Sequence, residues 1–280
     1  MKIRLLTAAV ALPIIIASII LPLWYSHAIW LFVAIAVFAL AAGLFEFYSL
    51  TKKMELKADA GIGYLASALL LVGFLFDAPS EAPSLLLATL AFVITLVLIT
   101  QAFRFRLDFS KMLTGTGVTL LGVLWIAFLG GFLVSIRIGF DTPIGLSSHL
   151  LAYFFLITFG SDAGAYFAGK ALGKRKLAPS ISPGKTYEGL IGGLLAAAAL
   201  AALSTWWFFP ELPYRFSIPL ALIIAALGVL GDLVESTIKR GAGAKDAASI
   251  LPGHGGLLDR LDSLLFGAPV LYYFARIYFG

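Results

Sequence analysis

The sequence contains no cysteine and few charged residues, and both shortages narrow what the protein can be. Without cysteine the chain has neither a disulfide framework nor a thiolate metal site. Charged residues make up 12% of the chain, whereas a soluble globular protein carries about 25%. Hydrophobic residues make up 61% of the 280 positions, which is more than one soluble core of this size can bury. Lipid must therefore solvate most of the surface.

Long apolar segments follow one another along the chain, and a membrane-spanning helix needs about 20 such residues. We therefore expect an all-α, polytopic integral membrane protein with about nine transmembrane helices. The first segment follows a short basic start, as in a signal peptide, but it is long and further spans follow at once, so we expect it to be retained. The nine expected helices are Leu5–Trp24, Ile29–Leu50, Gly61–Phe76, Ser84–Thr100, Leu113–Ile136, Ser147–Ala168, Gly189–Phe209, Ile218–Val234 and Ser263–Phe279.

Lysine and arginine are distributed unevenly between the loops that these helices define. If the N-terminus is cytoplasmic, 17 of the 20 basic residues fall on the cytoplasmic side and only Arg137, Arg215 and Arg276 fall outside. Cytoplasmic loops of membrane proteins carry this excess. We therefore expect a multi-pass protein of the inner, cytoplasmic membrane, with its N-terminus in the cytoplasm and its C-terminus outside. The same distribution explains the net charge of +5 without nucleic acid as a partner.

The chain reads as a single membrane domain, residues 1–280, whose two halves differ in polarity. Residues 1–146 are expected to supply scaffold and lipid-access helices, and residues 147–280 the chemistry. Two expected cytoplasmic loops, 169–188 and 237–262, are long, charged and rich in glycine and proline. Loops of this length are usually functional or disordered, and the mixed charge of these two favours function.

Acidic residues recur at helical spacing beside the second loop. Asp232, Glu235 and Lys239 lie three and four residues apart, so they share one helix face, and Asp259 and Asp262 share a face at the start of the last helix. Ion pairing or helix capping is the plain structural alternative. Magnesium prefers hard oxygen ligands, often carboxylates together with substrate phosphates. Converging aspartates next to basic residues therefore favour a metal–triphosphate site.

Glycine-rich segments and a second polar loop accompany these acids. Gly241–Gly243 and Gly253–Gly256 could form ordinary turns, but around Lys245, Asp246 and His254 they indicate a phosphate cradle, because glycine lets backbone N–H groups approach phosphate oxygens. In the earlier loop, Asp162 is a site candidate because an acid inside an apolar helix is costly. Ser182, Lys185, Thr186 and Glu188 cluster before the next helix, in which Gly189 and Gly193 are expected to pack closely against a neighbour.

Two runs resemble one known family. Ser236-x-x-Lys-Arg-x4-Lys-Asp, followed by Leu251-Pro-Gly-His-Gly-Gly-x-x-Asp-Arg-x-Asp262, resembles the signature of CDP-diacylglycerol synthases, also called phosphatidate cytidylyltransferases. Lys-Leu-x-Pro-x-Ile-Ser-Pro-x-Lys-Thr-x-Glu-Gly, from Lys176 to Gly189, is similar to the same family, which commonly has Asp-Thr where this chain has Asp162-Ala163. The resemblance is strong in the second half, whereas in the first half only the helical layout agrees.

The resemblance implies that CTP and phosphatidate react to CDP-diacylglycerol and pyrophosphate, in a homodimer that uses Mg²⁺ and a second cation such as K⁺. Two anions must then be brought together, so catalysis is mainly charge neutralisation and alignment, and no protein nucleophile is needed. The expected metal ligands are Asp232, Asp259 and Asp262. The expected catalytic residues are Lys239, Arg240, Lys245, Asp246, His254 and Arg260, and the expected substrate-binding residues are Ser182, Lys185, Ser236, Gly255 and Gly256.

Two other functions use similar features. A CTP-dependent lipid-alcohol kinase would act on the same kinds of substrate but would transfer the γ-phosphate. A secondary transporter could also use intramembrane aspartates, but its binding residues would lie at the membrane midplane between repeats. Here the charged residues gather on one expected side of the membrane and no repeat is visible, so the cytidylyl transfer is favoured.

Overall fold

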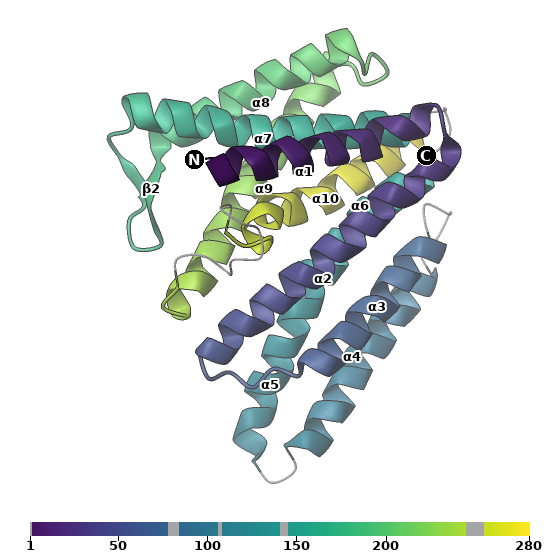
Figure 1. The fold of residues 1–280 in the computed structure, drawn as a ribbon, viewed down its shortest axis with the longest axis vertical. Coiled ribbons are helices and arrows are strands. Elements are labelled where there is room, and N and C mark those ends of the chain that lie inside the picture. The colour runs from purple at the N-terminus through teal and green to yellow at the C-terminus, as the bar shows by residue number, and fades with distance from the viewer. Residues whose placement is uncertain (1, 78–83, 106–107, 141–144, 245–254) are drawn as a thin grey trace.

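The computed structural model describes the chain apart from residues 1, 78–83, 106–107, 141–144 and 245–254, and the side chains of residues 2–8 are also outside the description. Most described residues are helical (Figure 1). The α-helices are α1 (Lys2–Ile20), α2 (Ile29–Lys53), α3 (Ala60–Phe76), α4 (Ser84–Arg104), α5 (Phe109–Gly122), α6 (Leu129–Gly139), α7 (Leu146–Leu172), α8 (Tyr187–Trp207), α9 (Tyr214–Gly241) and α10 (Leu258–Phe279).

The expected helices coincide with these elements, so the all-α, polytopic membrane architecture is confirmed. One expected span, Leu113–Ile136, corresponds to α5 and α6 joined by a π-helical segment, Val123–Phe128. In the described part of the chain, six helical segments are long and apolar enough to cross a membrane, and two further apolar helices are shorter. The chain is thus a multi-pass membrane protein, while the number of crossings and the sidedness of the termini stay predictions.

The helices form two groups that meet at α10. In Figure 1, α7, α8 and α9 lie on one side of the molecule and α2 to α5 on the other. α10 packs against α9 and α7 from the first group, against α2 from the second, and against α6. Buried aromatic side chains fill the interior between the groups, among them Phe47, Phe132 and Phe154. The first half of the chain therefore supports the helix that carries Asp259 and Asp262.

Glycines decide which helices approach each other most closely. A Cβ added at Gly189 would lie 2.9 Å from the carbonyl oxygen of Ala165, and one at Gly193 would lie 2.9 Å from that of Ser161. Both contacts hold α8 against α7, so the expected close packing at these two glycines is confirmed. Small residues allow this kind of backbone approach between membrane helices.

Glycines also allow α9 and α10 to approach each other, and this approach is even closer. A Cβ added at Gly231 would lie only 2.4 Å from the backbone oxygen of Asp262, and one at Gly228 would lie 3.4 Å from the Cβ of Ser263. Any side chain at Gly231 would therefore push the two helices apart. This close approach brings the polar ends of α9 and α10 together.

A hairpin of two short strands lies between α7 and α8. β1 (Lys176–Ala178) pairs antiparallel with β2 (Ser182–Thr186), with Lys176 opposite Thr186 and Ala178 opposite Ser182. The hydroxyl of Thr186 accepts a hydrogen bond from the backbone N–H of Gly189 and so caps α8. Hydropathy predicted only an irregular loop here, because the segment is too polar and too short for its strands to stand out.

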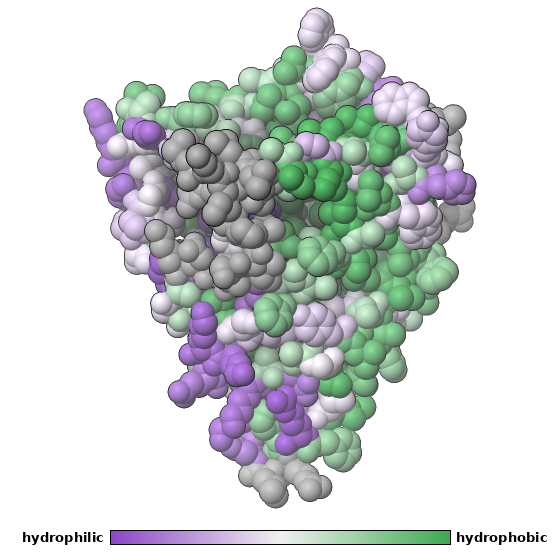
Figure 2. All heavy atoms as spheres, in the orientation of Figure 1, coloured by the Kyte–Doolittle hydropathy of each residue, from purple (hydrophilic) through white to green (hydrophobic). Residues whose placement is uncertain are grey.

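Hydrophilic and hydrophobic residues occupy different parts of the surface. Figure 2 shows hydrophilic residues on the side that bears the hairpin and the adjoining lower ends of the helices, and hydrophobic residues over much of the opposite side. Large apolar side chains, among them Phe76, Leu87 and Ile277, are more than two-thirds exposed in the isolated chain. Lipid is the solvent that makes such exposure favourable.

Candidate active site

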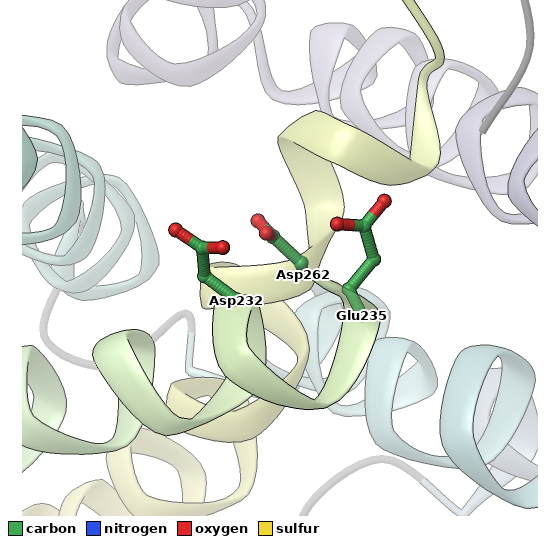
Figure 3. Close-up of side chains that lie close together, drawn as sticks. All are labelled: Asp232, Glu235 and Asp262. Carbon is green, nitrogen blue, oxygen red and sulfur yellow. The ribbon is translucent and has the colours of Figure 1, made fainter. Parts of the chain in front are cut away.

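Three carboxylates converge where α9 and α10 approach each other. Asp232 and Glu235 come from α9, and Asp262 comes from the first turns of α10 (Figure 3). One oxygen of each lies within 4.8 Å of the others. Glu235 and Asp262 are buried, whereas Asp232 is partly exposed. Such a group of hard oxygen donors, open on one side, fits a divalent cation that also binds substrate phosphate.

The local sequence explains this convergence. Residues three apart on a helix share a face, so Asp232 and Glu235 both point from α9 toward α10. Gly231, which precedes them, allows the backbone of α10 to approach at Asp262. The glycine and the two acids therefore act together, since the glycine sets the helix separation across which the carboxylates meet.

Lys239 neutralises part of this charge. Its ammonium nitrogen lies 2.6 Å from Oε2 of Glu235 and 2.6 Å from Oδ1 of Asp259. The other oxygen of Asp259 accepts a hydrogen bond of 2.8 Å from the backbone N–H of Gly256. Asp259 thus contacts Lys239 and Glu235 at the edge of the group of three carboxylates and is not one of the three. Its role as a metal ligand stays a prediction that these contacts do not favour.

Lys185 brings the hairpin into the site. From β2, its ammonium nitrogen lies 2.8 Å from Oδ2 of Asp232 and donates to the backbone oxygen of Val229 at 3.2 Å. The hydroxyl of Ser236 donates to the other oxygen of Asp232 at 3.1 Å. The hairpin and the polar end of α9 therefore meet in space, and Lys185, Ser236 and Asp232 form one contact network.

The remaining described candidates surround this network. Arg240 donates from Nε to the backbone oxygen of Ile181, in the turn of the hairpin, so it joins the end of α9 to the strands that hold Ser182. Asp162, on α7, interacts electrostatically with Asp232, Lys185 and Arg260. Lysines and arginines from three elements thus border the same group of acids. Such a setting suits a substrate that carries several phosphates.

The charge balance of the group favours a bound cation. Three carboxylates this close repel one another strongly in a partly buried site. Burial, together with the charge of Asp232, raises the pKa of Asp262, which precedes the apolar part of α10, to about 7. Oε1 of Glu235 is buried and has no hydrogen-bond partner among the described residues. A divalent cation would satisfy that oxygen and would stabilise the ionised form of the acids, so the residues present fit Mg²⁺.

Two glutamates contribute that were not among the predicted site residues. Glu235 shares the helix face of Asp232, a signal that was visible in the sequence, but an ion pair explained it equally well. Glu46, on α2, is fully buried, and its two oxygens accept hydrogen bonds of 2.8 and 2.7 Å from the backbone N–H groups of Leu257 and Leu258. It therefore accepts hydrogen bonds from the N–H groups at the start of α10 that have no partner within the helix. No local signal links Glu46 to residues more than 200 positions away.

Part of the predicted site lies outside the described residues. This applies to Lys245, Asp246 and His254 and to Gly253 of the second glycine-rich segment. Gly255 is described and has a φ of 80°, a conformation that favours glycine. The backbone N–H of Gly256 binds Asp259. Gly256 therefore holds the loop to α10, and a role in binding substrate stays a prediction for both glycines.

Similarity to known proteins agrees with this geometry. The profile of the cytidylyltransferase family matches residues 2–278. The chain belongs to the cytidylyltransferase family. A phosphatidate cytidylyltransferase of Bacillus subtilis (strain 168) is 35% identical over 246 residues, which cover 85% of this chain and 87% of the relative. One of Brucella suis biovar 1 (strain 1330) is 35% identical over 251 residues, which cover 88% and 86%.

The similarity to this cytidylyltransferase family reaches beyond the signature. A phosphatidate cytidylyltransferase of Haemophilus influenzae (strain ATCC 51907 / DSM 11121 / KW20 / Rd) is 47% identical over 129 residues, 45% of each chain. The family match begins at residue 2 and the longer alignments cover most of the chain. The first half, where the sequence showed only a shared helical layout, therefore belongs to the same family as the charged loops.

Proposed function

We propose that this protein transfers the CMP moiety of CTP to phosphatidate, which yields CDP-diacylglycerol and pyrophosphate for phospholipid biosynthesis. The observation that carries the proposal is the group of three carboxylates between α9 and α10, bordered by Lys185 and Lys239, in a membrane protein of the cytidylyltransferase family. Both substrates are anions, and one is a membrane lipid. A site that combines acids for a cation with bases for phosphates, at the polar end of apolar helices, suits both.

Asp232, Glu235 and Asp262 would hold Mg²⁺. In this proposed ligand set, Glu235 takes the place of Asp259, which the sequence analysis had predicted. When bound, Mg²⁺ neutralises phosphate charge and polarises the bond that breaks. Asp259 would instead orient Lys239. A second cation such as K⁺ stays a proposal from the family resemblance. The described residues contain no second group of acids close enough to hold it.

The chain's own residues would position and neutralise the reactants. Lys185 and Lys239 can turn from their present carboxylates toward phosphate oxygens once a cation neutralises those acids. Arg260 lies within electrostatic range of Asp162, near the same acids. Phosphatidate's phosphate would attack the α-phosphorus of CTP, and pyrophosphate would leave. Alignment of the two anions by fixed charges supplies most of the catalysis in such transfers.

Location and assembly are parts of the same proposal. CTP is a cytoplasmic metabolite, so the site would face the cytoplasm from the inner membrane, and the excess of basic residues in the loops on that side supports this orientation. The N-terminus would then be cytoplasmic and the C-terminus outside. A homodimer is proposed from the family resemblance alone.

Radiolabelled CTP tests the proposed reaction directly. Purified protein in lipid–detergent micelles is given phosphatidate, Mg²⁺ and CTP labelled at either the α- or the γ-phosphate. We expect α-label to enter the lipid and γ-label to appear in pyrophosphate. Transfer of γ-label to a lipid alcohol would instead establish a kinase. Movement of a solute across liposomes without CTP consumption would establish a transporter.

A further inference from the structure

An apolar groove of about 410 Å³ lies between α1 and α7. Leu12, Ile16 and Ile19 line it from α1, and Ala152, Leu156 and Phe159 line it from α7. Its volume is within the range of roughly 300–1,000 Å³ that is typical of small-molecule sites. It is too small for a helix, which is about 10–12 Å wide with its side chains. A thin, flexible apolar chain is therefore the better occupant.

One face of α7 leads from this groove to the acids. Ala152, Leu156 and Phe159 follow one another at intervals of four and three residues, so they share a helix face. The next residue on that face, three positions beyond Phe159, is Asp162, which is exposed. Asp162 interacts electrostatically with Asp232 and Lys185 of the candidate active site. The face of α7 that lines the groove thus leads to Asp162 at the polar end of the helix.

The length of this path matches half a membrane. Ten residues separate Ala152 from Asp162, which corresponds to about 15 Å along a helix. The hydrocarbon core of a bilayer is about 30 Å thick, so one leaflet is about 15 Å. Figure 1 shows α1 lying along α7 with its N-terminus toward the hairpin, so the groove and the polar residues of the site are arranged along the same direction. A single acyl chain has the length of one leaflet.

We propose that this groove binds one acyl chain of the lipid substrate and thereby places the lipid phosphate near Lys185, at the polar end of α7. The proposal rests on the proposed function, since it names the part of the protein that recognises the lipid. Burial of each methylene contributes about 0.8 kcal/mol, so one chain supplies enough affinity to orient the phosphate. The alternative is that bulk membrane lipid fills the groove. In that case the groove would have no effect on KM for phosphatidate.

Filling the groove tests this. In Ile16→Trp a larger side chain occupies the space between α1 and α7. We expect KM for dipalmitoyl phosphatidate to rise about tenfold, the effect of losing roughly two buried methylenes, while kcat and the KM for CTP stay unchanged. Turnover of dihexanoyl phosphatidate, whose chains are too short to fill the groove, should be unaffected. The control is Ile14→Trp, because Ile14 is exposed on the opposite face of α1.

Other outcomes would overturn the proposal. An equal loss of activity with the long-chain and the short-chain lipid would mean that Ile16 only supports packing. No loss of activity with either lipid would mean that the groove does not select the substrate. If Ile14→Trp raised KM for the long-chain lipid as much as Ile16→Trp does, the effect would come from contact with the bilayer and not from the groove.

A second measurement needs no turnover, so it separates this proposal from the reaction itself. Phosphatidate with a photoreactive diazirine in one acyl chain is cross-linked to the protein, and the attachment sites are mapped by mass spectrometry. We expect cross-links at Leu12, Ile16 and Leu156, with competition by unlabelled long-chain phosphatidate. Cross-links spread evenly over exposed apolar helices, without competition, would overturn the proposal. If these cross-links form but CTP is not consumed, the groove stands and the proposed reaction fails.

Discussion

Two helix pairs in this protein meet in opposite ways. α9 and α10 approach so closely that a Cβ at Gly231 would lie 2.4 Å from the backbone of α10, and carboxylates converge beside that contact. Between α1 and α7, by contrast, a groove of about 410 Å³ remains, lined mostly by leucine, isoleucine and phenylalanine side chains. The glycine at the first contact lets backbones touch, whereas the second contact leaves apolar space.

This difference matches what each substrate needs. A cation with phosphates requires several oxygens fixed within a few ångströms, and rigid helix packing at a glycine provides that. An acyl chain has no polar group to fix, so an open apolar groove suffices. In this account α7 joins the two places, because it carries one wall of the groove and also Asp162, which interacts with the acids.

The largest effect is expected at the rigid contact, from removal of one carboxylate. Asp262→Asn keeps the shape of the side chain but removes its charge, so we expect turnover with Mg²⁺ to fall about 1,000-fold, as it does when a fixed electrostatic contact to the transition state is lost. The assay is release of pyrophosphate by purified protein. Asp108→Asn is the control, because Asp108 is a partly exposed acid that precedes α5 and pairs with Lys111, three residues further on. Unchanged turnover in Asp262→Asn would remove this residue from the site.

Separating α9 from α10 should have the next largest effect. In Gly231→Leu the new side chain meets the backbone of Asp262, and a displacement of about 1 Å can lower a rate about 100-fold. Size-exclusion chromatography of the detergent-solubilised protein checks that it still folds. Gly117→Leu is the matched control, since a Cβ there meets nothing within 4 Å. Full activity of Gly231→Leu would show that the helix separation does not set the site.

A smaller effect is expected from Glu46, which supports the rigid contact from the first half of the chain. Glu46→Gln leaves one oxygen for the two N–H groups at the start of α10. We expect about a tenfold loss of Mg²⁺ affinity in activity titrations, because outer residues that orient ligands have effects of that size. Excess Mg²⁺ should restore kcat. A loss that Mg²⁺ does not restore would assign Glu46 a purely structural role, and Glu55→Gln, at an exposed glutamate, serves as the control.

Much of the fold was predictable because hydropathy is a local signal. Each apolar segment became a helix, and the glycines of α8 pack against α7 as expected. Spacing also predicted that Asp232 and Asp262 would approach each other, since each stands at the polar end of its helix. The hairpin was not predicted, because its pairing depends on a turn between two short polar runs.

Contacts between distant parts of the chain were beyond the sequence. The choice of Glu235 rather than Asp259 depends on which acid lies close to both Asp232 and Asp262, and that follows only from how α9 and α10 are placed. The contact of Glu46 with Leu257 and Leu258 joins α2 to α10 across most of the chain. Periodicity predicts which residues share a face but not which helix that face meets.

Direct metal binding tests the central claim, that the carboxylates at the α9–α10 contact hold the cation. Mn²⁺ replaces Mg²⁺, and electron paramagnetic resonance measures its binding to wild type and to Asp232→Asn, Glu235→Gln and Asp259→Asn, each with CTP present. We predict that Asp232→Asn and Glu235→Gln lose most of the bound Mn²⁺, whereas Asp259→Asn retains it. Loss of Mn²⁺ in Asp259→Asn with retention in Glu235→Gln would contradict the account.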